Sequence, residues 1–229
     1  MSTLYIVATP IGNLEDMTLR AIRILKEVDI ILCEDTRVTK RLLEKYAIAN
    51  KQLTTYNSQK SGVALKKIEN WIREGKNLAL VSDAGTPGIS DPGSELVRKL
   101  KRKSGGEELQ VVPIPGPSAL PAAISAAGIP AAEFLFLGFL PHKKGRETLF
   151  NEMAERERAV VFYESPHRIM KTLKKLSQIL SNMRIVSVGR EITKIYEEFV
   201  NDSPNGVLEY FEKNQDHIRG EFVVIVGGK

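Results

Sequence analysis

The sequence contains a single cysteine, Cys33, among its 229 residues. One cysteine excludes an internal disulfide and is typical of proteins in a reducing cytoplasm. The three histidines are scattered along the chain, and together with this cysteine they lack the spacing of a metal site. Because Cys33 ends the apolar run Ile30-Ile31-Leu32, we expect its side chain to lie in the core.

Long hydrophobic runs are also missing, since proline, glycine or charge interrupts each apolar segment before it reaches the length of a membrane span. The amino-terminal residues lack the basic and apolar regions of a signal peptide. A hydrophobic fraction of 42% and a length of 229 residues suffice for one large domain or two small ones. We expect a cytoplasmic globular protein.

The excess of basic residues is small, with a net charge of +5. This charge is compatible with an RNA partner without requiring one. Lys143, Lys144 and Arg146 stand together after Pro141, and we expect these three to contact RNA phosphates. Basic residues elsewhere, such as Lys171, Lys174 and Lys175, are expected to solvate the surface of a helix.

Three loops rich in glycine and proline each follow an apolar strand and precede a helical pattern. They begin at Ala8, Ser82 and Pro113, and the second of them along the chain reads SDAGTPGISDPG. Because the carboxyl ends of parallel strands lie at one edge of a sheet, we expect the three loops to converge on a ligand. None of them matches the dinucleotide fingerprint or the phosphate loop of an ATPase.

Short apolar strands alternate with amphipathic helices in the first half of the chain, which predicts a parallel sheet covered on both faces. The expected strands are 4–8, 30–33, 53–55, 78–81 and 109–114, and the expected helices are 18–27, 38–46, 61–74 and 94–103.

After Ser118 the pattern becomes mixed. We expect helices at 119–127, 146–157 and 166–180, with strands at 134–139, 160–163, 185–188, 197–200 and 222–226. The strands 185–188 and 197–200 are too close for a helix between them, so they predict an antiparallel hairpin. The expected domains are 1–116 and 117–229, with the active site in the cleft between them.

Seven motifs follow one another along the chain: YIVATPIGNL, CEDTR, SDAGTPGISDPG, PGPSAL, FLGFLP, FYESPHR and GREITKIYEE. In this order they resemble the bacterial ribosomal RNA small subunit methyltransferase I family, which belongs to the tetrapyrrole methylase fold group. The resemblance implies transfer of a methyl group from S-adenosylmethionine to a cytidine ribose 2′-hydroxyl in the decoding region of 16S rRNA. The substrate is either the free rRNA or the assembled small subunit.

The resemblance also implies where the cofactor binds, in the three loops and two later segments. The implied cofactor residues are Pro10, Ile11, Asp83, Ala84, Gly85, Thr86, Pro87, Ser118, Ala119, Leu140, Phe222 and Val223. Methyl transfer from a sulfonium needs an in-line approach and little covalent help, so positioning by such loops supplies most of the rate.

Charged residues follow three of the predicted strands at their carboxyl ends. A ribose hydroxyl is a weak nucleophile, so its methylation needs a base or a cation near the reacting oxygen. The catalytic candidates are Glu34, Arg37, Glu164, Arg190 and Lys194. For each residue alone, an internal ion pair is an equally good interpretation.

Two alternatives remain at this point: a methylase of the same fold acting on a carbon of a tetrapyrrole, or an RNA-binding assembly factor without catalysis. The basic residues after Pro141 and the TPIGN loop favour RNA over a tetrapyrrole. Three cofactor-type loops argue against a factor without catalysis. Relatives of this fold form dimers, so we expect a homodimer. The apolar segments 119–127 and 134–140 either are buried between its subunits or belong to the ordinary core.

Overall fold

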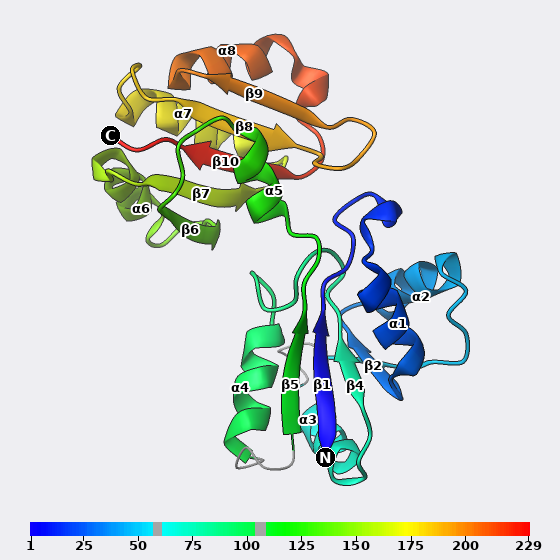
Figure 1. The fold of residues 1–229 in the computed structure, drawn as a ribbon. Coiled ribbons are helices and arrows are strands. Elements are labelled where there is room, and N and C mark those ends of the chain that lie inside the picture. Colours follow the sequence, from blue (N-terminus) through cyan, green and yellow to red (C-terminus); the bar gives the residue numbers. More distant parts are fainter. Residues whose placement is uncertain (57–60, 104–108) are drawn as a thin grey trace. The chain divides into compact units, whose positions relative to one another are not determined.

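Figure 1 shows the fold in a computed structural model that describes residues 1–56, 61–103 and 109–229. The chain divides into unit 1, Met1–Ser118, and unit 2, Ala119–Lys229, each with its own five-stranded sheet. Within the described ranges, no helix is long and apolar enough to cross a membrane.

Unit 1 is a parallel sheet with the strand order β3-β2-β4-β1-β5. Its strands are β1 (Ser2–Val7), β2 (Ile30–Cys33), β3 (Gln52–Thr55), β4 (Leu78–Leu80) and β5 (Leu109–Ile114). Its helices are α1 (Leu19–Glu27), α2 (Thr36–Lys45), α3 (Ser61–Arg73) and α4 (Gly93–Lys103).

Helices cover both faces of this sheet, as the sequence predicts (Figure 1). On one face, α1 and α2 pack against alternate strand residues such as Ile31 and Cys33. On the other face, α3 and α4 pack against Leu32 and Leu80. Every residue of β2 is buried, because neighbouring side chains of a strand point to opposite faces and both are covered here. The expected core position of Cys33 is confirmed.

Unit 2 is a mixed sheet with the strand order β6-β7-β10-β8-β9, in which β6 and β7 are parallel and the other pairs are antiparallel. Its strands are β6 (Phe134–Phe139), β7 (Ala159–Glu164), β8 (Val186–Arg190), β9 (Glu198–Asp202) and β10 (Phe222–Val226). Its helices are α5 (Ala119–Ala126), α6 (Arg146–Glu155), α7 (Ile169–Ile179) and α8 (Pro204–Lys213). The predicted hairpin is the β8–β9 pair.

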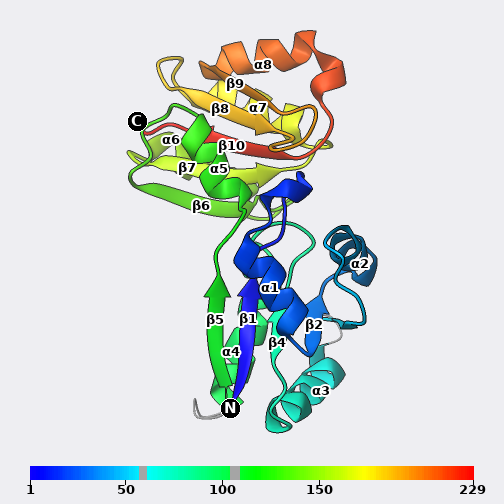
Figure 2. The ribbon, with the colours of Figure 1, turned by 45° about the vertical axis from the view of Figure 1, so that its right-hand side comes forward.

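The core of unit 2 lies between its sheet and three helices. Phe150 of α6, Leu173 of α7 and Phe211 of α8 pack on one face of the sheet. Helix α5 crosses the opposite face, as Figure 2 shows, and the side chain of Asn201 on β9 donates to the carbonyl of Ala127 at 2.9 Å.

Helix α8 is not among the helices that the sequence predicts. It begins after Ser203, whose hydroxyl accepts a hydrogen bond from the N–H of Gly206 at 3.1 Å, and Pro204 occupies its first turn. Serine before a proline is a strong start signal for a helix, and the spacing of Val207 and Phe211, both buried, is helical. The local signal for this helix is therefore present in the sequence between the two strands.

Candidate functional site

The three loops rich in glycine and proline meet at the carboxyl edge of the sheet in unit 1, as the sequence predicts. Thr9, after β1, exchanges two backbone hydrogen bonds with Gly85, after β4, at 2.9 and 3.0 Å. The hydroxyl of Thr86 donates to the carbonyl of Pro117, after β5, at 3.0 Å. Because β1 lies between β4 and β5 in the sheet, all three loops become one connected surface.

The loop after β4 turns around the carboxylate of Asp91, which accepts hydrogen bonds from the N–H groups of Gly88 and Gly93, each at 2.7 Å. Gly85 has a φ of +83°, a left-handed conformation that favours glycine. The loop is therefore held in shape by its own contacts, which lowers the entropy cost of ordering it around a ligand.

Acidic side chains lie beside this surface, where β2 ends. The carboxylate of Asp83 accepts from the N–H of Asp35 at 3.0 Å, and that of Glu34 accepts from the N–H of Asp83 at 3.3 Å. Burial raises the pKa of Glu34 and of Asp83. The hydrogen bonds from Arg37 to Asp35 lower the pKa of Asp35 to about 2. Asp35 is thus tied to the exposed Arg37, whereas Glu34 is the stronger base.

The implied cofactor residues of unit 1 lie on or under this surface. Pro10, Gly85 and Pro87 are buried, whereas Ile11, Thr86 and Ser118 are partly exposed. Asp83 and Ala84 are exposed. An exposed carboxylate beside apolar side chains and loop backbone suits a ligand that carries hydroxyl or ammonium donors beside an apolar ring.

In unit 2, the implied cofactor residues are placed differently. Leu140 and Phe222 have exposed fractions of 1% and 2% and belong to the core under α6, α7 and α8. Their side chains are occupied by packing, so a ligand would meet their backbone. Val223, the next residue on β10, points to the opposite face because side chains alternate along a strand. Ala119 begins α5.

Glu164 is enclosed at the end of β7, with an exposed fraction of 1%. Its two carboxylate oxygens are bound separately: one contacts Arg146 at 2.9 Å and Thr172 at 2.7 Å, and the other contacts Arg168 at 2.8 Å. The two arginines also donate to the carbonyls of Pro141 and Leu140, at 3.2 and 2.8 Å. This buried network fastens the chain at 140–141.

This network bears on two residues that the sequence singles out. The oxygens of Glu164 are enclosed by protein donors, which favours a structural role for it over catalysis. Arg146 has an exposed fraction of 7% and pairs with Glu164, which favours a structural role for it over RNA binding. Lys143 and Lys144 are both exposed, on the turn that the network fastens.

Arg190 and Lys194, the remaining candidates of unit 2, are also engaged by protein partners. Arg190 is buried and donates to the carbonyls of Arg219 and Tyr196, at 2.9 and 3.3 Å. Lys194 contacts the carboxylates of Glu191 and Glu221, at 2.8 and 2.9 Å. Arg190 therefore supports the turn after β8, which favours a structural role for it over catalysis. Lys194 keeps part of its side chain exposed, so its role stays a prediction.

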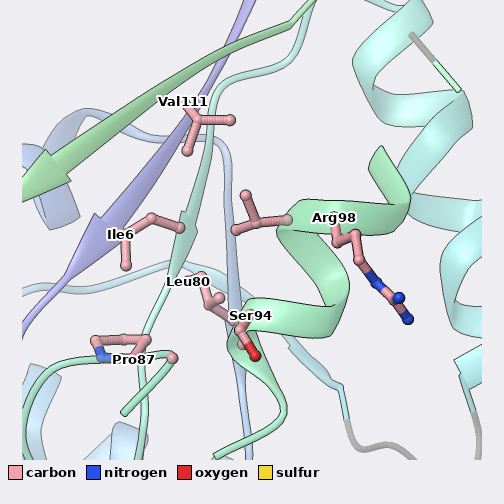
Figure 3. Close-up of a pocket in the computed structure, with 9 residues that line it drawn as sticks. Ile6, Leu80, Pro87, Ser94, Arg98 and Val111 are labelled. Atoms are coloured by element: carbon pink, nitrogen blue, oxygen red, sulfur yellow. The ribbon is translucent and has the colours of Figure 1, made fainter. Parts of the chain in front are cut away.

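A hollow of about 350 Å³ in unit 1 lies between the sheet and α4 (Figure 3). Its lining is mostly apolar, with the polar side chains of Ser94 and Arg98, and is formed by Ile6, Leu80, Pro87, Gly88, Gly93, Ser94, Val97, Arg98 and Val111. The loops after β1 and β5 contribute no residue to this lining. The hollow therefore adjoins the loop after β4 and shares Pro87 with the implied cofactor residues.

Among the described residues, no group of three or more His, Cys, Asp or Glu side chains is arranged to hold a metal ion. The polar groups that the described site offers a ligand are carboxylates, basic side chains and loop backbone.

Comparison with known proteins identifies the family. The sequence model of the family of tetrapyrrole (corrin/porphyrin) methylases matches residues 3–203. The chain is 44% identical to the ribosomal RNA small subunit methyltransferase I of Thermotoga maritima over 229 residues, all of both chains. It is 45% identical to the protein of the same name from Bacillus subtilis, covering 100% of this chain and 76% of that one.

Solved structures share the fold at lower identity. A cobalt precorrin-4 methyltransferase of cobalamin biosynthesis aligns with a TM-score of 0.70 at 19% identity, over 98% of this chain and 94% of that one. A uroporphyrin-III C-methyltransferase from Thermus thermophilus, complexed with S-adenyl homocysteine, aligns with a TM-score of 0.64 at 20% identity, over 98% and 97%.

The Glu164 network predicts a large effect on stability. Changing Glu164→Gln leaves two enclosed arginines without their counter-charge, so we expect the free energy of unfolding to fall by about 3–5 kcal/mol. Urea denaturation followed by circular dichroism measures this change. Glu147→Gln is the control, because Glu147 forms an exposed pair with Lys175, and it should cost at most about 1 kcal/mol. Equal effects of the two substitutions would contradict the proposed support of residues 140–141.

Proposed function

Since this chain belongs to the tetrapyrrole methylase family and, within it, to the ribosomal RNA small subunit methyltransferase I family, we propose that it methylates 16S rRNA. The group transferred is the methyl of S-adenosylmethionine, and the acceptor is the 2′-hydroxyl of a cytidine ribose in the decoding region. Such a substrate implies a cytoplasmic enzyme. The observation that carries the proposal is the joined surface of the three loops in unit 1.

The family relatives favour RNA over a tetrapyrrole as the substrate. Relatives named for ribosomal RNA share 42–47% of residues over nearly the whole chain. The similarity to enzymes named for tetrapyrroles stays near 20% and concerns the fold. The exposed Lys143 and Lys144 add a site for phosphates, which a polyanionic substrate needs.

In this proposal the cofactor lies on the joined loops. S-adenosylmethionine supplies an electrophilic methyl group on its sulfonium. Asp83 accepts hydrogen bonds from ligand donors, and the backbone at Gly85 and Thr86 with the flanking Pro10 and Ile11 positions the ligand. Rigid loops raise the rate because they hold the methyl group in line with the incoming oxygen.

The ribose proton is the second requirement. We assign its removal to Glu34, because burial raises its pKa whereas hydrogen bonds from Arg37 lower that of the neighbouring Asp35. Arg37 and Lys194 remain candidates for stabilising negative charge on the ribose oxygen. A carboxylate must be ionised to accept a proton, so the methylation rate should rise with pH through the pKa of Glu34.

The direct test is methyl transfer in vitro. Purified protein with S-adenosylmethionine labelled in its methyl group should modify one ribose of 16S rRNA, either free or in the small subunit, located by mass spectrometry of nuclease fragments. Glu34→Gln should lower the single-turnover rate far more than the affinity for the cofactor. Label on uroporphyrinogen III instead of RNA would favour a tetrapyrrole methylase. RNA binding without transfer to either substrate would favour an assembly factor.

The cofactor loop is tested by substituting two glycines that have similar positive φ angles, one inside the loop and one outside it. A Cβ atom at Gly85 would lie 3.4 Å from Ile11 in the joined surface, whereas one at Gly75 would have no neighbour within 4 Å. Both have positive φ, +83° and +76°, so valine strains either backbone. Gly85→Val should weaken binding of S-adenosylmethionine severely in calorimetric titration, whereas Gly75→Val should preserve it. Unchanged affinity in both variants would remove this loop from the cofactor site.

Lys143 and Lys144 are proposed to bind RNA phosphates, and this predicts a specific salt dependence. Each lysine–phosphate interaction that is removed lowers the slope of log affinity against log salt concentration by about 0.7–0.9. Lys143→Gln with Lys144→Gln should therefore flatten the slope for 16S rRNA. Lys171→Gln with Lys174→Gln, two exposed lysines on α7, is the matched control and should leave it unchanged. An unaltered slope in the first pair of substitutions would exclude this turn.

We further propose that the protein is a homodimer. Phe134 and Phe139, at the two ends of edge strand β6, are 41% and 57% exposed, which is apolar surface available for burial between subunits. Light scattering at micromolar concentration should give twice the mass of one chain, and the mass of a single chain would contradict the proposal.

A further inference from the structure

Residues 191–197 form the turn between β8 and β9. Its tip presents two large apolar side chains to solvent, Ile195 with an exposed fraction of 95% and Tyr196 with 70%. Single exposed apolar residues are ordinary, but two in sequence at the tip of one turn are not explained by the core of unit 2.

The turn is held in one conformation by side chains at its base. The carboxylate of Glu191 accepts from the N–H of Glu221 at 2.9 Å and from the ammonium of Lys194 at 2.8 Å. The carboxylate of Glu197 accepts from the N–H of Thr193 at 2.5 Å. Arg190 donates to the carbonyl of Tyr196 itself, at 3.3 Å.

The backbone of this turn is strained. Glu191 and Thr193 have φ values of +50° and +69°, in the left-handed region that side chains other than glycine rarely adopt. Such conformations persist only where the surroundings hold them, and the contacts of Glu191, Lys194 and Glu197 do so here. These contacts therefore hold the turn in a conformation in which Tyr196 is exposed.

The position of the turn in unit 2 points to the occupant. Phe222, at the start of β10, pairs with Glu164 on one side and with Arg190 on the other. The turn after β8 therefore lies at the same end of the strands as Glu164, whose buried network holds the chain before Lys143 and Lys144. Lys143 and Lys144 follow β6 and the turn follows β8, three strand spacings away across the sheet, or about 14 Å. A short stretch of nucleic acid spans that separation.

We propose that the tip formed by Ile195 and Tyr196 is a stacking platform for an unpaired base of the RNA substrate, while Lys143 and Lys144 hold the adjoining phosphates. Single-stranded RNA is recognised by stacking its bases on aromatic side chains beside basic groups. A rigid platform suits this role because little further ordering is needed when the base binds. Arg190, which donates to the carbonyl of Tyr196, acts as a positioning residue for the tip. The inference deepens the proposed function and rests on it.

The test is binding of a fluorescein-labelled oligocytidine of twelve nucleotides, measured by anisotropy without methyl transfer. Tyr196→Ala should weaken binding between about fivefold and a hundredfold, the range for loss of one stacked base. Tyr196→Phe should keep most of the affinity, because the ring remains. Met183→Ala is the matched control: Met183 is 92% exposed and precedes the opposite end of β8. It should change the affinity by less than about twofold, within the range of an ordinary surface substitution.

A direct readout of stacking comes from Tyr196→Trp in a Trp71→Phe background, since Trp71 is the single tryptophan of the chain. Stacking should quench the fluorescence of the introduced indole when the oligocytidine binds. Unchanged affinity of Tyr196→Ala, or unquenched fluorescence at saturating oligocytidine, would overturn the inference. A Tyr196→Ala variant with a changed mass in light scattering but unchanged affinity for RNA would also overturn it, because the tip would then contact another protein chain.

The outcomes separate this inference from the proposed function. Methyl transfer to 16S rRNA by wild-type protein, with no effect of Tyr196→Ala on binding, removes the platform and leaves the function. A stacking effect in a protein that transfers no methyl group keeps the platform and removes the function.

Discussion

Parallel pairing of β1 with both β4 and β5 is the constraint on which the candidate site depends. Parallel strands end at the same edge, so the loops that follow three neighbouring strands emerge side by side. The paired backbone bonds between Thr9 and Gly85, and the bond from Thr86 to Pro117, then join these loops. Without the common strand direction, the same glycines and prolines would be separate surface turns. Sheet topology, more than any single side chain, creates the surface.

In unit 2, charged side chains at a strand end support the fold. Glu164, Arg146 and Arg168 lie at the end of β7, where a sequence argument expects catalysis, yet they pair with one another and hold the chain before Lys143 and Lys144. Burying these charges is tolerated because each carboxylate oxygen has a protein donor. The effect of these enclosed charges on the fold is to hold the chain that carries other groups. Arg190 likewise supports the turn that carries Tyr196.

Much of the fold is predictable because local patterns and sheet geometry agree. The strands 30–33, 109–114, 134–139 and 222–226 have the bounds that the sequence predicts, since each is a short apolar run between clear breaks. Helix α8 is the exception: Ser203 and Pro204 mark its start, but the strands on either side of it give the stronger pattern. Of the candidate site, the meeting of the loops is predictable, and the roles of charged residues at strand ends are not.

The sequence by itself determined the parallel sheet of unit 1, the three loops and the family, because these depend on spacing and residue type along the chain. Only the tertiary structure decided which charges are enclosed. Arg146 and Lys144 are two residues apart and look alike in sequence, but one is buried against Glu164 and the other is exposed. The difference arises because the partner of Arg146 on α6 is Glu164 on β7, and contacts between distant segments cannot be read from local pattern. Burial then determines whether a charge stabilises the fold or is available to a ligand.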